Sequence, residues 1–490
     1  MKKTFKTMLA LMAGAMLFSA CSSEDEFENI NEQKASALKS MTFTASMEGQ
    51  DGDTRATIDG TFINWSENDK IAIFDGVEDA DHNFAREFTL TGGAGSTSGT
   101  FTGTAKEGAE TYYALYPYAA SSSTSRVPTD AEAKAAAGDY DYWLDNMWKM
   151  DWDDYYSRYP EKLKQEMDAC LISPENQAII LAYLKGVPAT IKSGVQQDGS
   201  QFSEVILPAK QTVAEGQYVD PNAMLMIAKS TDASTLQFKN VCAYVKVKPT
   251  FDCAGIALRS TDATKYLAGT VTVDYNGGAP TTTVTANGSN EVLLTGAIKA
   301  DNTYYIAVRP ETLSGGFIIE FVTTDKSHYY ARSTNKSLGL ARNSVTNLGE
   351  FATTGSWTVK SPTSGTDGAH AWILVSPTIR LATEESAGKV TPDAVDGIWG
   401  DKWVLPSEEE ASLIGGNSSW TYTNKAATIG TSAIFSEVLS CEISISSSYF
   451  WSSKTEGERR WFHGFGEESA AGGNGGPTST NCVLYKYIGE

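Results

Sequence analysis

The sequence predicts a mostly β protein, in which two tandem β-sandwich domains, the first with a helical insertion, are followed by an α+β domain. Short β-branched and aromatic runs recur between Gly, Ser and Thr turns from residue 71 to residue 351, which is typical of all-β domains. A stretch with helical spacing interrupts them at about 128–187. A Ser/Thr/Gly-rich passage at 353–368 marks the start of a last domain with a different pattern. With 490 residues the chain is also too long for a single core.

The first sandwich is expected to span 56–230 and to begin with a hairpin. The runs 62–65 and 71–74 are rich in β-branched and aromatic residues, and the polar residues 66–69 between them have the composition of a turn. Apolar residues on both parities of the second run predict a strand that is covered on both faces. A later strand is expected to stop at Pro117, because proline cannot donate to a ladder.

The helical insertion is predicted from its start signal and its spacing. Ser173 precedes Pro174, a favoured first residue of a helix, and apolar residues at helical spacing continue to Leu184. In front of it, residues 139–159 hold eight aromatic side chains among aspartates. Packing of the insertion and a ligand surface both explain that stretch. A calcium loop does not, because the required glycine is missing.

The second sandwich is expected over 231–355, with the join between the two near 229–234. Its strands are predicted at 236–247, 255–259, 269–275, 304–309, 316–323 and 345–351.

The N-terminus has the pattern of an export signal. Lysines precede an apolar run at 8–18, which is too short to span a membrane, and small residues follow before Cys21. This resembles the bacterial lipobox, in which the cysteine is lipidated, so residues 1–20 are expected to be a lipoprotein signal peptide. An ordinary signal peptide with a chance cysteine is the alternative. Residues 21–55, which are poor in aromatic side chains, are expected to form a lipidated tether and pro-segment.

The charge balance narrows the range of partners. The chain has 39 basic and 60 acidic residues and a formal charge of -21. Such an excess argues against nucleic acid and anionic lipid as partners. It also suits an exported protein that must stay soluble.

The cysteines number six, and the five that remain beside Cys21 leave at least one thiol unpaired. Cys242 with Cys253, across a possible hairpin, and Cys441 with Cys482 are the expected disulfides. The spacing lacks a CxxC pair, so no zinc site is predicted. No metal or other cofactor is expected elsewhere.

The order of the motifs resembles the fimbrillin, or type V pilin, superfamily of Bacteroidetes. The matching pieces are TRAT, FINWSENDKIAIF, YYALYPY, LPAKQTVAEGQYVDPNAMLMIAK, LQFKNVCAYVKV and SVTNLGEF, between residues 54 and 351. The resemblance implies export as an outer-membrane lipoprotein and cleavage between Arg55 and Ala56, which removes the first strand. It also implies assembly with other pilin subunits by donor-strand insertion into a fimbrium on the cell surface.

The region 356–490 is similar to C-type-lectin-like domains. The succession that carries the likeness is W-x-LPS-x-x-E, then YFWSS, then an aromatic strand, then a cysteine-containing strand near the end. Ser407 and Glu410 predict a capping box at the start of a helix. The calcium signatures of sugar-binding lectins are absent. Because a shaft subunit should end soon after Phe351, the extra domain implies a pilus tip subunit that binds a host or microbial glycan or protein.

Four side chains of this domain are candidates for ligand contact: Trp403, Trp451, Trp461 and His463. Flat rings stack on sugar faces and anchor protein contacts, although tryptophans of a small domain also fill its core. The sequence has no HExxH, GxSxG or Walker motif, so an enzyme is not expected. The alternative is a non-polymerising surface lipoprotein that binds glycans for uptake.

Overall fold

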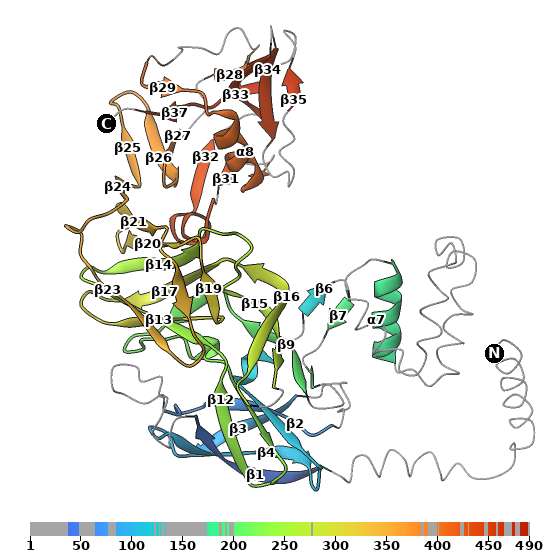
Figure 1. Ribbon diagram of the computed structural model, residues 1–490. Helices are drawn as coiled ribbons and strands as arrows, with labels where there is room; N and C mark the ends of the chain where they lie inside the picture. Colours follow the sequence, from blue (N-terminus) through green and yellow to red (C-terminus); the bar gives the residue numbers. More distant parts are fainter. Residues whose placement is uncertain are drawn as a thin grey trace, which may run out of the picture.

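The computed structural model has three β-rich parts that follow one another in space (Figure 1). A barrel lies at the bottom of the view, a middle domain of several sheets lies above it, and a C-terminal domain lies at the top. The residues that the structure describes are 38–48, 64–76, 85–121, 124–126, 128, 133, 174–185, 189–191, 194–195, 200–275, 278–383, 387–390, 399, 401–421, 426–429, 431–444, 449–456, 459–464, 473–475 and 481–488.

The barrel is a closed sheet in the order β1-β12-β11-β5-β2-β3-β4. Its strands are β1 (Leu38–Met47), β2 (Lys70–Phe74), β3 (Arg86–Gly92), β4 (Ser98–Lys106), β5 (Tyr112–Tyr116), β11 (Met226–Ser230) and β12 (Thr235–Asn240). Trp65 fills its interior and meets Phe101, Tyr116 and Phe238 edge to face at 4.9 to 5.6 Å between ring centroids. The predicted strand at 71–74 is confirmed, and β5 ends before Pro117 as expected.

Two expectations about this part of the chain are wrong. The first is the hairpin between 62–65 and 71–74: β2 pairs with β3 and β5 instead of with a preceding strand. The described residues 64–66 do not form a strand. The predicted tether, 21–55, contains β1, whose Phe43 and Ala45 are completely buried in the barrel. The alternation of inward and outward residues in β1 is the physical reason, because one apolar face suffices to bind a strand to a core.

The middle domain is built from four sheets. A six-stranded sheet has the order β10 (Lys210–Val213), β17 (Glu291–Ile298), β14 (Cys253–Ser260), β20 (Phe317–Thr323), β21 (His328–Thr334), β24 (Val359–Pro362). A second sheet holds β18 (Tyr304–Val308), β13 (Ala243–Pro249) and β23 (Val345–Phe351). A third has the order β16 (Thr281–Ser289), β15 (Ala268–Asp274), β9 (Gln201–Leu207), β8 (Gly194–Val195), and β19 (Glu311–Leu313) pairs with β22 (Leu338–Leu340).

The chain passes between the barrel and the middle domain more often than two tandem domains require. β9 and β10 belong to sheets of the middle domain, yet β11 and β12 return to the barrel before β13 begins. The predicted join at 229–234 therefore falls between two neighbouring barrel strands, and the boundary between 56–230 and 231–355 is wrong. One continuous core cluster includes side chains of both parts.

The insertion is described only in part. Its helix α7 (Pro174–Lys185) begins at the predicted proline, and β6 (Thr124–Arg126) pairs with β7 (Ala189–Ile191). The aromatic stretch 139–159 lies outside the described residues.

The C-terminal domain has three sheets and a short helix. One sheet has the order β25 (Ser364–Thr366), β26 (Ala371–Ser376), β27 (Ile379–Ala382), β37 (Lys486–Tyr487), β29 (Trp403–Val404). Another has the order β28 (Ala387–Val390), β36 (Asn481–Val483), β33 (Tyr449–Glu456), β34 (Arg459–Gly464), β35 (Gly473–Gly475), and the third holds β30 (Ser418–Thr421), β31 (Ala426–Ile429) and β32 (Cys441–Ser444). Helix α8 (Glu408–Gly416) starts with the predicted capping box of Ser407 and Glu410.

Neither predicted disulfide is present, because Cys242, Cys253 and Cys441 are free thiols. Cys242 directly precedes β13 and Cys253 is the first residue of β14; because these strands lie in different sheets, the expected hairpin between them does not exist. Cys441 donates to the carbonyl of Leu374, and burial raises the pKa of its thiol to about 12. Its strand β32 and the strand of Cys482 also belong to different sheets; the Cys482 side chain lies outside the described residues.

Candidate functional site

The barrel is closed by its first strand, β1. On one side β1 pairs antiparallel with β4 over almost its whole length, from Leu38 opposite Lys106 to Ser46 opposite Ser98. On the other side it pairs in parallel with β12, from Thr44 opposite Thr235 to Met47 opposite Phe238. Without β1, therefore, the sheet would have two open edges that face the same gap.

The side chains of β1 alternate between the core and the solvent, as a half-buried strand requires. Met41, Phe43, Ala45 and Met47 pack against the core, whereas Thr42 and Thr44 are exposed. The ring of Phe43 meets Phe88 and Tyr112 edge to face, at 5.5 and 5.2 Å between centroids. Reasoning from the residues alone missed this strand, although their alternation from residue 41 to residue 47 was an available signal and the family resemblance implies a first strand before the cleavage position.

A charged clamp holds the residue that follows β1. The carboxylate of Glu48 accepts two hydrogen bonds from the Arg342 guanidinium, at 2.7 and 2.9 Å, and one from the backbone N–H of Asn240 at 3.1 Å. Burial opposes the charged carboxylate, but the hydrogen bonds and the charge of Arg342 outweigh it and hold the pKa of Glu48 below its ordinary value. Because Arg342 belongs to the middle domain, the clamp ties β1 to both parts.

Arg342 and Asn240 are themselves positioned by further contacts. Arg342 donates to the Asn240 carbonyl at 2.6 Å. The Asn240 side chain donates to the Tyr244 hydroxyl at 3.2 Å and to Asn343 at 3.3 Å, and it accepts from the backbone N–H of Cys242 at 2.9 Å. Asn240 and Tyr244 are buried. The groups that receive Glu48 are thus part of a fixed network.

A cavity of about 340 Å³ opens at the same end of the barrel, beside the 3-10 turns η1 (Tyr118–Ala120) and η3 (Pro221–Ala223). Inside it, Asp69 accepts from the Tyr116 hydroxyl at 3.1 Å and from the Ser66 backbone at 2.7 Å. Burial raises the pKa of Asp69 against these two hydrogen bonds. The lining combines carboxylate, amide and lysine side chains with proline and tyrosine rings, so the cavity is part polar and part apolar.

The structure describes the four ligand candidates of the C-terminal domain but not the lipidation and processing residues. Cys21, Arg55 and Ala56 lie outside the described residues, with Arg55 between Glu48, the end of one described stretch, and Asn64, the start of the next. In the C-terminal domain, Trp403, Trp451 and His463 are buried, with 2 % of the surface exposed or less. Their assignment to ligand contact is wrong in this structure, because they form core. Trp461 is partly exposed and stays a candidate.

An aromatic group on the C-terminal domain was not predicted. His370 stacks on Trp399 with 3.7 Å between centroids and 7° between planes, and Trp399 meets Trp403 edge to face at 5.0 Å. The Trp403 indole donates to Asp367 at 2.6 Å, and this bond and the backbone N–H groups of Ala369 and His370 lower the pKa of the Asp367 carboxyl to about 2. His370 and Trp399 are partly exposed. Their pairing depends on tertiary structure, so the sequence alone gives no signal for it.

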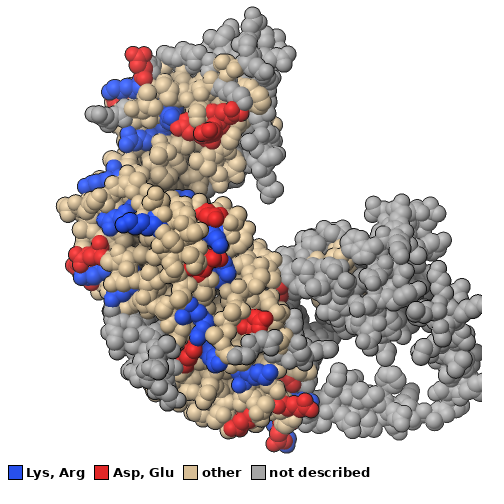
Figure 2. All heavy atoms as spheres, viewed as in Figure 1, with Lys and Arg blue, Asp and Glu red and all other residues tan. Residues whose placement is uncertain are grey.

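The described part of the chain offers neither a metal centre nor a membrane-spanning helix. No group of three or more His, Cys, Asp or Glu side chains lies close enough to hold a metal ion there. No helix among the same residues is long and apolar enough to cross a membrane. On the face shown in Figure 2, acidic and basic side chains are interspersed among the described residues.

Comparison with known proteins gives remote structural neighbours only. No family model and no curated protein matches the chain. A candidate cell adhesion protein from Bacteroides ovatus has 10% identity and a TM-score of 0.32, and the match covers 66% of this chain and 96% of that one. A fimbrial protein from Bacteroides ovatus has 12% identity and a TM-score of 0.23 over 92% and 99%. A fimbrial assembly protein from Parabacteroides distasonis has 10% identity and a TM-score of 0.23 over 66% and 96%.

Proposed function

We propose that this chain is a structural and adhesive subunit of a cell-surface pilus, in which an extended strand of another subunit replaces β1. The observation that carries the proposal is the position of β1. It is a complete, core-forming barrel strand, and all of it precedes Arg55 in the chain. A cut between Arg55 and Ala56 would leave β1 attached by non-covalent contacts alone.

Physical chemistry makes the vacated groove a strand-binding site. Loss of β1 would remove the ladder partners of β4 and β12 and open the pocket that holds Phe43. Each buried backbone group left without a partner costs about 1–3 kcal/mol. An extended segment of another chain restores both the ladder and the apolar contacts, which is the logic of β-strand addition.

The remote neighbours are named as cell adhesion and fimbrial assembly proteins. The geometry of β1 is what supports the proposal for this chain. Within the proposed role, Cys21 carries the lipid that anchors the precursor in the outer membrane. The C-terminal domain extends beyond the last strand of the middle domain and is the part that would bind a glycan or protein at a pilus tip, with Trp461 as one contact.

The test is whether cleavage at Arg55 precedes assembly. We expect the chain in purified fibres to begin at Ala56, and we expect Arg55→Ala to remain uncleaved and absent from fibres. Arg55→Lys is the matched control, because a trypsin-like protease accepts either basic residue. N-terminal sequencing and immunoblots of sheared fibres provide the measurement. A fibre-borne chain that still includes β1 would contradict strand replacement, and wild-type protein found only on the membrane would support the non-polymerising lipoprotein.

A further inference from the structure

The contacts that Glu48 makes with Arg342 and Asn240 indicate which strands can replace β1. This inference rests on the proposed strand replacement. When β1 leaves, Glu48 leaves with it. Among the described residues, Glu48 is the one carboxylate that contacts Arg342, so Arg342 loses its counter-charge when Glu48 leaves. The backbone N–H of Asn240 loses its acceptor at the same time. The fork geometry of a guanidinium fits a carboxylate with two parallel hydrogen bonds, and such charge-assisted pairs are stronger than neutral ones.

We infer that the barrel selects donor strands with an acidic residue at the register of Glu48, and that Arg342 is the residue that selects. The position is defined by the ladder. Met47 lies opposite Phe238, and the backbone N–H of Glu48 donates to the Phe238 carbonyl at 2.7 Å. The acid therefore comes directly after the last residue that packs on the core.

The full donor pattern follows from the places that β1 fills. It has apolar residues at the positions of Met41 and Met47, an aromatic residue at Phe43, a small residue at Ala45 and an acid at Glu48. The partner is thus another subunit whose extended segment carries this spacing. A neutral residue at the last position would leave the Arg342 guanidinium partly buried, with 20% of its side chain exposed, and without its counter-charge.

The experiment uses the full chain with a site-specific protease sequence in place of residues 52–57. After cleavage, labelled peptides of residues 38–50 compete with the resident strand, and fluorescence anisotropy gives their affinities. We expect the native peptide to bind about ten-fold tighter than the peptide with Glu48→Gln, because a charge-assisted pair is worth on the order of one factor of ten. In the Arg342→Ala chain this preference should disappear, and Arg342→Glu should prefer a peptide with Glu48→Lys.

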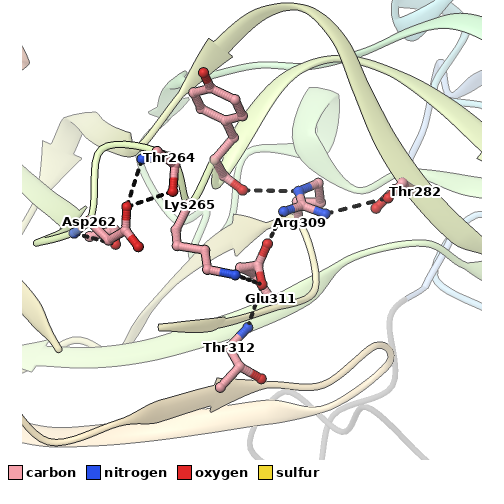
Figure 3. Close-up of polar contacts among 9 residues, drawn as sticks. Asp262, Thr264, Lys265, Thr282, Arg309, Glu311 and Thr312 are labelled. Carbon is pink, nitrogen blue, oxygen red and sulfur yellow. Dashed lines mark hydrogen bonds and ion pairs between the residues drawn. The ribbon is translucent and has the colours of Figure 1, made fainter. Parts of the chain in front are cut away.

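Arg309→Ala is the matched control. Arg309 lies in the same domain, has a similar burial and also pairs with an acid, Glu311; its other contacts are the carbonyls of Tyr266 and Thr282 (Figure 3). None of these partners belongs to the barrel, so the preference for the acidic peptide should remain. If the Glu48 and Glu48→Gln peptides bind the parent chain equally, the selection by Arg342 is refuted while strand replacement stands. If no peptide exchanges with β1, strand replacement itself is refuted.

Discussion

At the scale of single residues, the most informative group outside the barrel is Glu291, buried between the middle and C-terminal domains. One carboxylate oxygen accepts from the backbone N–H of Ala433 at 2.9 Å, and the other has no hydrogen-bond partner among the described residues. Nearby, Glu320 accepts from Tyr329 at 2.6 Å and from Arg259 at 3.4 Å. Burial, and then the charge of Glu320, raise the pKa of Glu291 to about 7 against the Ala433 hydrogen bond and the charge of Arg259.

This pKa predicts a loss of stability as the pH rises. The folded chain binds the Glu291 proton more tightly than the unfolded chain, so the contribution is complete below the unfolded pKa, near 4.5, and is lost as pH passes through about 7. The loss amounts to at most about 3 kcal/mol. We expect urea unfolding between pH 5 and pH 8 to show a smaller change for Glu291→Gln than for the parent chain. The exposed Glu350→Gln should keep the parent's dependence; identical pH profiles for all three would refute the assignment.

At the scale of elements, β1 should contribute strongly to the stability of the uncleaved barrel. Phe43→Ala removes a completely buried ring from between Phe88 and Tyr112, so we expect a loss of about 3–5 kcal/mol in the free energy of unfolding. Thr44→Ala, at the next and exposed position of the same strand, should change it by less than about 0.5 kcal/mol. Denaturant unfolding of the full chain measures both. Equal, small effects would mean that β1 does not close the barrel in solution.

The same elements show what the sequence could and could not predict. Helix α8 was predictable because its signal is local: Ser407 and Glu410 lie within one turn and bond to each other's backbone. The partners of β1 lie on β4 and β12, far along the chain, so the local alternation of residues 41–47 suggests a strand but not which strands it pairs with. The pairing of Cys242 with Cys253 failed for a related reason. Consecutive strands suggest a hairpin, yet β13 and β14 lie in different sheets.

At the scale of the whole molecule, the C-terminal domain is joined to the middle domain by a shared hydrophobic core and not by a linker alone. A single cluster of buried side chains contains Tyr329 and Val322 of the middle domain together with the π-helical turn η5 (Ile434–Leu439). The ring of Phe435 lies 5.2 Å from that of Tyr329, and β24 and β25 carry the chain from one domain to the other within a few residues. A force applied to the C-terminal domain would therefore pass to the middle domain through packed side chains.

The shared core predicts that the two domains unfold together and that one substitution can separate them. Phe435→Ala should cost about 3–5 kcal/mol, because it leaves a cavity between the domains, and calorimetry should then show an earlier transition for the C-terminal domain. Glu437→Ala is the control on the same turn. It removes an exposed ion pair with Lys210 across the same junction, at 2.5 Å, and such pairs contribute about 0–1 kcal/mol. The parent and Glu437→Ala should each show one transition for the two domains, and limited proteolysis should release the C-terminal domain first only from Phe435→Ala. Separate transitions already present in the parent chain would show that the junction does not couple the two domains.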